Sequence, residues 1–307
     1  MDRPVYLGLL VVAVVAAAGL GTLDASTRGR TGTGMGVGME TGAEGGDTEA
    51  GESAPVGEPA PGTTVETRTA ASAAGADSSG ADPASASSLA YPPGTTAEGI
   101  RHPSRLLGVH TDALAETGFI VRSSVNATVP ETGMRIDATA RGGARVASNA
   151  STYYAHRSDA AGPLERRTEG WYGGNIEHHH RVGKFGSVQE STQRARSIGE
   201  LAGQPLLAPH LRGGAFEAAR VDHIGDRRLF VFTATGIENE RLVETELPEA
   251  STDVRSYDAR LLVDRVGRAY SLTVRAEYVI GGKPATYRLD YDLARLGNAS
   301  VEQPGWV

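Results

Sequence analysis

The chain has no cysteine among its 307 residues. It can therefore form no disulfide and no thiolate metal site, and it has no cysteine nucleophile and no lipid-modified cysteine. Lysine is scarce as well: only Lys184 and Lys283 are lysine, so 28 of the 30 basic residues are arginine. Aromatic residues make up only 6% of the chain. Sequence patterns of several enzyme classes are also missing, since no G-x-S-x-G stands at a strand-to-helix turn and no H-E-x-x-H or Walker pattern is present. We predict no catalytic residue and no cofactor.

Positive charge is not in surplus anywhere in the predicted folded part. The net charge is −7, and residues 24–95 hold ten acidic residues against three arginines. Residues 96–307 hold 26 acidic and 26 basic residues. A nucleic-acid-binding domain concentrates positive charge, so we expect no nucleic-acid partner. The arginine bias, with abundant Ala, Gly, Asp and Glu, is typical of a halophilic archaeon.

The first long apolar segment is Val5 to Leu23. It is uncharged, follows Arg3, and its 19 residues would span about 28 Å as a helix. It predicts either a signal peptide, cleaved near Ala16 to Ala18, or a retained membrane anchor with its amino end in the cytoplasm. Both interpretations place the rest of the chain outside the cell, on the cell membrane or secreted.

Residues 24–90 have no hydrophobic period and no aromatic residue. Gly, Ala, Ser, Thr, Pro and acidic residues dominate them. Such a segment cannot bury enough apolar surface to offset its ordering entropy, so we expect a disordered linker, either a plain spacer or an O-glycosylated stalk.

The predicted folded domain, residues 91–307, is organised around three C-terminal runs that alternate between apolar and polar residues. Gly267 separates the first two runs, and Gly281-Gly282 separates the last two. Strict alternation is typical of antiparallel strands with one buried face. The apolar positions are Tyr257, Ala259, Leu261 and Val263, then Tyr270, Leu272, Val274, Ala276, Tyr278 and Ile280, then Tyr287, Leu289, Tyr291 and Leu293.

Other patterns complete the predicted domain. A helix is expected from Pro103 to Gly118 and a second from Ser191 to Ala202, and Pro205 and Pro209 are expected to break the chain after the second helix. Strands are expected in between, with weak patterning over 164–180, and again over 216–221 and 229–235. The prediction is an α+β fold: a curved antiparallel sheet of about 8–11 strands, a half-barrel, packed on two or three helices.

Both ends of the domain resemble a known group of proteins. Tyr91-Pro92-Pro93-Gly94 before a helix, and the closing segment from Leu296 to Val307 with its N-A-S-V-E-Q-P-G-W motif, are similar to haloarchaeal surface lipoproteins of uncharacterised function. The export signal of that family ends in a cysteine, which this chain lacks, so its apolar segment would be the only anchor. The element order also resembles the half-barrels of bacterial lipoprotein carriers and mycobacterial lipoproteins (LolA and LppX type). That resemblance implies a space for a lipid-like ligand between sheet and helices.

Histidines suggest one chemical site. His178 and His180 would share one face of a strand, as in metal-binding H-x-H pairs. A third ligand would come from Glu177, His156, His210 or His223; the alternative is a solvated strand that carries histidines. The carboxylates Glu238, Glu240, Glu244 and Glu246 are expected in a polar surface loop.

Three N-x-[ST] sequons, at Asn126, Asn149 and Asn298, predict N-glycosylation in an exported domain.

Three functions remain open. The first is a surface-displayed module that binds an apolar or lipid-like ligand, and the second is a structural or protein-interaction module of the cell surface without a cavity. The third, an enzyme or metal-binding protein, rests only on the histidines.

Overall fold

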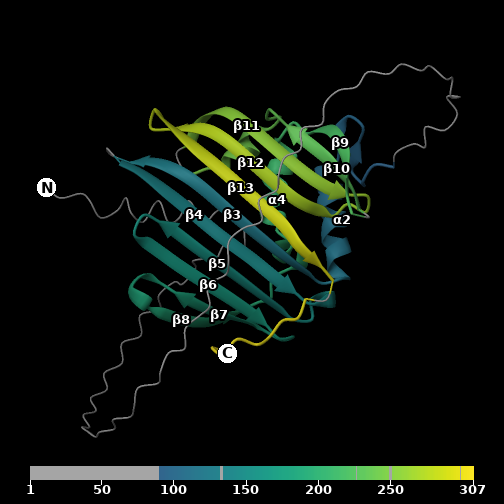
Figure 1. Cartoon of the computed structure of the whole chain (residues 1–307). Coiled ribbons are helices and arrows are strands. Elements are labelled where there is room, and N and C mark those ends of the chain that lie inside the picture. The colour runs from purple at the N-terminus through teal and green to yellow at the C-terminus, as the bar shows by residue number, and fades with distance from the viewer. Residues whose placement is uncertain (1–89, 132–133, 226, 249–250, 298) are drawn as a thin grey trace, which may run out of the picture. The chain divides into compact units, whose positions relative to one another are not determined.

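The computed structural model describes residues 90–131, 134–225, 227–248, 251–297 and 299–307 (Figure 1). The expected membrane segment at residues 5–23 and the expected linker as far as residue 89 lie outside the described residues. Within the described part of the chain, no helix is long and apolar enough to cross a membrane.

Strands dominate the domain, and four short or medium helices interrupt them. The N-terminal elements are β1 (Thr95–Thr96), β2 (Gly99–Ile100), α2 (Pro103–Ala115), β3 (Phe119–Glu131), β4 (Met134–Val146), the 3-10 helix η1 (Ser148–Ala150), β5 (Tyr153–Ala161), β6 (Leu164–Tyr172), β7 (Glu177–Val182), the 3-10 helix η2 (Lys184–Gly186) and β8 (Val188–Gln193). The C-terminal elements are α3 (Ile198–Leu201), α4 (Gln204–Gly213), β9 (Glu217–Ile224), β10 (Arg227–Ala234), α5 (Glu240–Glu244), β11 (Ser251–Asp264), β12 (Ala269–Ile280) and β13 (Lys283–Leu296).

One curved sheet of eleven antiparallel strands forms the body of the domain. Its order is β8-β7-β6-β5-β4-β3-β13-β12-β11-β10-β9. Strands β3 to β8 form one meander and β9 to β13 a second, because neighbours in each are consecutive in the chain. The meanders join where β3 pairs with β13, with Val125 opposite Leu289 and Ser123 opposite Tyr291.

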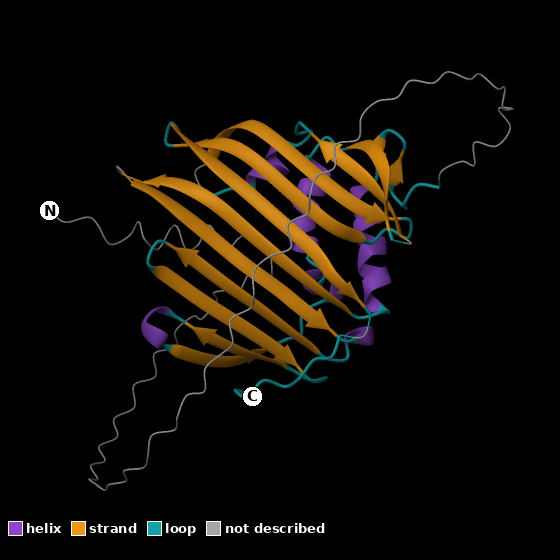
Figure 2. Ribbon diagram, in the orientation of Figure 1, coloured by secondary structure: helices purple, strands orange, loops and turns teal. Residues whose placement is uncertain are grey.

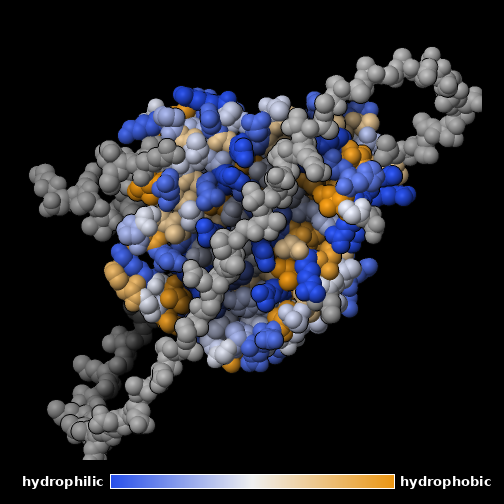
Figure 3. Space-filling view, in the orientation of Figure 1, coloured by the Kyte–Doolittle hydropathy of each residue, from blue (hydrophilic) through white to orange (hydrophobic). Residues whose placement is uncertain are grey.

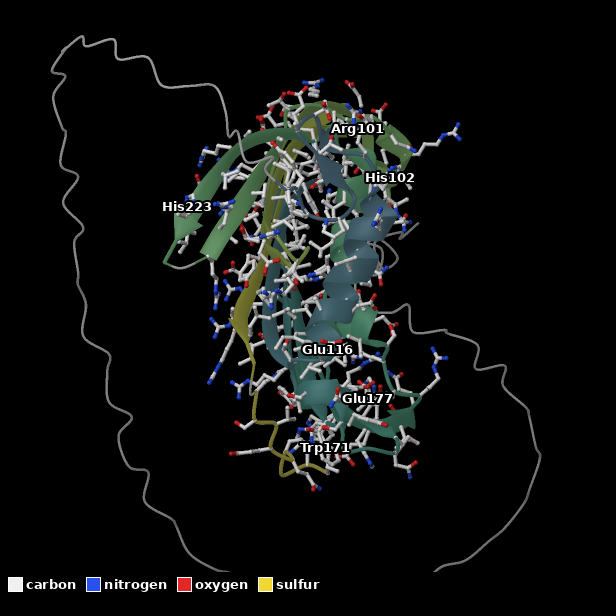
Figure 4. All side chains as sticks on the ribbon, turned by 90° about the vertical axis from the view of Figure 1, so that its right-hand side faces the viewer. Arg101, His102, Glu116, Trp171, Glu177 and His223 are labelled. Carbon is white, nitrogen blue, oxygen red and sulfur yellow. The ribbon has the colours of Figure 1, made fainter. Side chains whose placement is uncertain are left out.

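The helices cover one face of this sheet. Figures 2 and 4 show them behind the strands in one view and beside the edge-on sheet in the other. We call this helix-covered side the inner face and the opposite side the outer face. The core lies between helices and inner face, where Leu107 of α2, Leu207 of α4 and Leu289 of β13 are each at most 1% exposed. The outer face, seen in Figure 3, carries mainly hydrophilic side chains with scattered hydrophobic patches.

The three strands predicted at the end of the domain are confirmed, and so is the face that their apolar residues bury. Alternate residues from Tyr257 to Val263, and again from Tyr287 to Leu293, are buried on the inner face. Tyr270 was expected there as well, and it packs against the core but is only partly buried. A register shift between β11 and β12 places Ala269 opposite Val263, so Tyr270 stays half-exposed beside the guanidinium of Arg227.

The helix predicted over residues 191–202 is confirmed only at Ile198–Leu201 and is wrong over residues 191–197. Residues 188–193 form the edge strand β8, paired with β7, and only residues 198–201 are helical. The strand is exposed on nearly every side chain, so it carries no period-two signal. Pro209 does not break the chain either, since it lies inside α4. Burial of Leu206, Leu207 and Leu211 against the sheet outweighs the one lost backbone bond.

A matched pair of glycine substitutions tests how closely the helical layer packs on the sheet. Gly203, which precedes α4 as its N-cap, has φ of 81°, and an added Cβ would lie 2.6 Å from the ring of Tyr291. Gly282 in the β12–β13 turn has φ of 77° with nothing within 4 Å of such a Cβ. Both alanine variants bear the backbone strain of about 1 kcal/mol or more. We expect G203A to lose a further ~1–3 kcal/mol of unfolding free energy, because the Tyr291 ring must move. Urea titration of both full-length variants measures the difference. Equal losses of unfolding free energy in the two variants would show that α4 packs loosely on the sheet.

Candidate ligand-binding site

The inner face changes character along strands β3 to β5. Strands β3 and β5 carry the large side chains of Phe119 and Tyr153 at one end, whereas the other end of β3 to β5 carries small ones. We call the second group the small-residue band, and it consists of Ala127, Ala138, Ala140 and Ala161. The band lies in register across three strands, with Ala127 opposite Ala138 and Ala138 opposite Ala161. All four alanines are at most 7% exposed, so another part of the chain approaches the sheet closely here.

Glu246, directly after α5, is a buried carboxyl next to this region. It is 9% exposed, and its Oε2 atom has no hydrogen-bond partner in the part of the chain that the structure describes. Burial raises the pKa of Glu246 to about 7, against the opposing effect of the positive charge of Arg157. The expected surface loop is therefore corrected at this position. Glu240 is exposed as predicted, but Val243, Glu246 and Leu247 turn inward together.

Tyr287 of β13 interacts with the Glu246 carboxyl, and His210 of α4 packs on Tyr287. The rings of His210 from α4 and Tyr287 from β13 have centroids 5.9 Å apart, and the residues are 0% and 3% exposed. His210 Nδ1 lies 3.3 Å from the hydroxyl oxygen of Tyr257. His210 Nε2 and the Tyr287 hydroxyl have no partner among the described residues. Burial lowers the pKa of His210 to about 4, so its ring is neutral at neutral pH. Burial, followed by the charge of Glu246, raises the pKa of Tyr287 well above its usual value.

An ion-paired cluster continues this polar strip toward the β5–β6 hairpin. Asp159, whose side chain is 7% exposed, accepts from Arg157 Nε at 2.7 Å and from Arg166 Nη2 at 3.1 Å. Beside it lies a hollow of about 190 Å³ with mostly apolar walls, lined by Asp159, Ala160, Ala161, Leu164, Glu165, Arg166, Gly183 and Lys184. Ala161 belongs both to the small-residue band and to this hollow. The inner face thus combines a narrow apolar floor with a line of buried polar groups.

A second buried carboxylate, Glu177 on β7, has polar partners at both oxygens and serves the fold. It accepts a hydrogen bond from the Tyr153 hydroxyl at 2.7 Å and contacts His179 Nε2 at 3.0 Å and Arg196 Nη2 at 2.9 Å. Burial alone would raise the pKa of Glu177, but these three partners outweigh it and lower the pKa. The network connects the sheet to the segment that leads into α3, so we assign it a structural role.

The histidines predicted to bind metal do share one face, but the structure does not complete their site. His178 and His180 point to the outer face of β7, where Trp171 and Trp306 pack against their rings. Of the proposed third ligands, Glu177 faces inward and His210 lies in the core. His156 is separated from His180 by Glu169 in the strand register, and His223 lies at the opposite end of the domain from Trp171 (Figure 4).

No cluster of three potential metal ligands occurs in the described ranges. Metal binding by His178 and His180 stays a prediction.

Two of the three sequons can be placed. Asn126 lies exposed on the outer face of β3, and Asn149 lies exposed in η1 with φ of 57°. Asn298 lies outside the described residues. Glycosylation at these positions stays a prediction.

Sequence reasoning missed Arg157, Asp159, Glu246 and Tyr287 as site residues, and it singled out His210 only as a possible metal ligand. One signal was present for the first two, since Arg157 and Asp159 share the period-two positions of Tyr153, Ala155 and Ala161. No local pattern marks Glu246, because its burial depends on where α5 meets the sheet.

The pH dependence of folding tests the buried state of Glu246. A carboxyl whose pKa rises from 4.5 to about 7 on folding binds more protons in the folded state, so stability falls as pH rises between these values. His110 and His210, both with pKa lowered to about 4, act in the opposite direction between about pH 4 and 6.5. The informative quantity is therefore the difference in unfolding free energy between E246Q and wild type. We expect this difference to shift in favour of E246Q by about 3 kcal/mol from pH 4.5 to pH 8. Parallel stability curves in urea titrations across this range would show that Glu246 is solvated.

Comparisons with known proteins leave the family open. No protein-family model and no curated protein sequence matches the chain. Among solved structures, LprF from Mycobacterium bovis aligns over 68% of this chain and 98% of its own, with 12% identity and a TM-score of 0.35. A DUF1329 family protein from Desulfovibrio piger aligns over 64% and 92%, with 5% identity and a TM-score of 0.25. A putative outer membrane lipoprotein-sorting protein domain from Vibrio parahaemolyticus aligns over 63% and 92%, with 8% identity and a TM-score of 0.22. The fold, a large curved antiparallel sheet with a few helices, is assigned from the strand order and register of this domain itself.

Proposed function

We propose that this protein binds an amphipathic, lipid-like ligand on the inner face of its half-barrel, with the polar end of the ligand at Glu246, Tyr287 and His210. The observation that carries the proposal is the set of three unpartnered buried atoms: Glu246 Oε2, the Tyr287 hydroxyl and His210 Nε2. Buried polar atoms in folded proteins nearly always have a hydrogen-bond partner, and leaving one unpaired costs about 1–3 kcal/mol. Three together favour a site that a polar group of a ligand completes.

The chemistry of the three atoms narrows the class of polar group. A carboxyl, a phenol and a neutral imidazole together offer both donors and acceptors. A ligand group that can donate and accept, such as a hydroxyl, complements them better than a group limited to one role. The apolar part of the ligand would follow the small-residue band toward the hollow at Leu164. That hollow, about 190 Å³, is smaller than the roughly 300–1,000 Å³ typical of small-molecule pockets, so it would hold only one end of the ligand.

The cellular setting is part of the same proposal. An apolar segment at residues 5–23, whether cleaved or retained, and a polar linker after it support an exported protein at the outer side of the cell membrane. The cell membrane contains lipid-like molecules that such a protein could bind. The proposed role is binding and not catalysis.

Two conservative tyrosine variants separate ligand binding from folding. Y287F removes an unpartnered hydroxyl, so its stability should equal or exceed that of wild type, while ligand occupancy should fall about tenfold. Y278F is the matched control, because the Tyr278 hydroxyl donates to the carbonyl oxygen of Thr128 at 3.1 Å. It should lose about 1 kcal/mol of stability and keep its ligand.

The measurement is native mass spectrometry of the full-length chain from its producing cells, followed by extraction with organic solvent. A discrete extra mass that the solvent releases, and that Y287F specifically depletes, is the expected result. A bare polypeptide in every preparation would overturn the proposal and favour a structural or protein-interaction module of the cell surface.

A further inference from the structure

Both tryptophans of the chain lie at one place on the outer face of the sheet, away from the proposed lipid-like site. The chain has only two tryptophans. Trp171 belongs to β6 and Trp306 to the C-terminal segment. The Trp171 ring lies 5.9 Å from that of His178, and the Trp306 ring stacks on His180 at 5.2 Å with an interplanar angle of 22°. Residues 135 positions apart therefore flank the same short strand, β7.

Strand register builds an ordered array around these rings. One row across β5 to β8 reads Tyr154, Trp171, His178 and Thr192, and the next reads His156, Glu169, His180 and Glu190. The rings are held in place. Trp306 Nε1 donates to Glu169 Oε2 at 2.9 Å, and only a glycine at position 173 leaves room for the indole of Trp171.

A hollow of about 290 Å³ opens beside this array. It is lined by His178, His179, Glu190, Ser191, Thr192 and Trp306. Its wall offers one exposed carboxylate, from Glu190, the hydroxyl of Thr192 and the ring of the half-buried Trp306. Trp171 Nε1, at the edge of the array, has no hydrogen-bond partner among the residues the structure describes.

We propose that this hollow binds one pyranose unit of a carbohydrate. A pyranose has an apolar C–H face, which packs on an indole or imidazole ring, and an edge of hydroxyls, which need carboxylate, hydroxyl or imidazole partners. Trp306 and His178 provide the ring surfaces. Glu190 and Thr192 provide hydroxyl partners on the adjacent edge strand. An apolar peptide would offer no hydrogen bond to the Glu190 carboxylate, which lies 3.6 Å from His180 Nδ1, or to the Thr192 hydroxyl, so a sugar suits the site better.

Tryptophan fluorescence reports directly on this site, since both tryptophans of the protein belong to the array. The full-length chain is titrated with glucose, mannose, galactose, N-acetylglucosamine and glucuronate while tryptophan fluorescence is recorded. We expect a saturable change with at least one sugar. E190A should weaken that sugar about tenfold, because a hydrogen bond to a charged acceptor is lost. Q189A is the matched control, since Gln189 is exposed on the same strand but has the opposite facing, and its affinity should equal that of wild type.

Several results would overturn the proposal. The absence of a saturable change with every sugar of the panel would do so, as would equal affinities of E190A and Q189A. Near-ultraviolet circular dichroism of E190A checks that the array is intact, and Thr192→Ala provides a second variant with an exposed side chain. A fluorescence change produced by Zn²⁺ or Cu²⁺ but by no sugar, and lost in both H178A and H180A, would assign the array to metal binding.

Discussion

The pairing of β3 with β13 is the contact on which the rest of this domain depends. Each meander could form from neighbours along the chain, but a single meander would leave one face of its strands uncovered. Joining them along β3 and β13 makes one sheet of eleven strands, whose apolar inner face is wide enough for the helical layer. Two helices of that layer, α3 and α4, lie in the chain between the two meanders, after β8 and before β9. Tyr291 of β13 then donates to the carbonyl oxygen of Ala202 at 2.9 Å and so attaches the helices at the join.

Two buried glutamates show how the same residue type serves the fold in one place and points to a ligand in another. Glu177 has three polar partners, two of them cationic or able to be so, and a lowered pKa. Glu246 has a raised pKa and an unpartnered oxygen, and it interacts with Tyr287. Burying a carboxyl without partners is unfavourable, so a chain tolerates it most readily where function requires it. The small alanines on β3 to β5 let another part of the chain pack closely on the sheet in this region.

Sequence reasoning succeeded where a periodic pattern is strong and local. It predicted the helix at α2, the β9–β10 hairpin and the three closing strands, because alternation and turn glycines specify each with little help from distant residues. It failed at β8, where nearly every side chain is exposed and alternation disappears, and at α4, where tertiary burial overrides Pro209. It did not predict that Tyr270 is only partly buried, because the register shift there depends on the partner strand. Glu246 was expected in solvent because its side chain is charged, although Val243 and Leu247 near it turn inward.

The sequence by itself determined the class of this domain: an antiparallel sheet with one apolar face, covered by a few helices and balanced in charge. That much follows from local periodicity and composition, which act through neighbouring residues. Only the tertiary structure decided which residues meet. It placed Glu246, Tyr287 and His210 together on the inner face, and it placed Trp171 and Trp306 around β7 on the outer face. These groups come from segments far apart in the chain, and the strand order and register that unite them are properties of the whole sheet, which no single segment encodes.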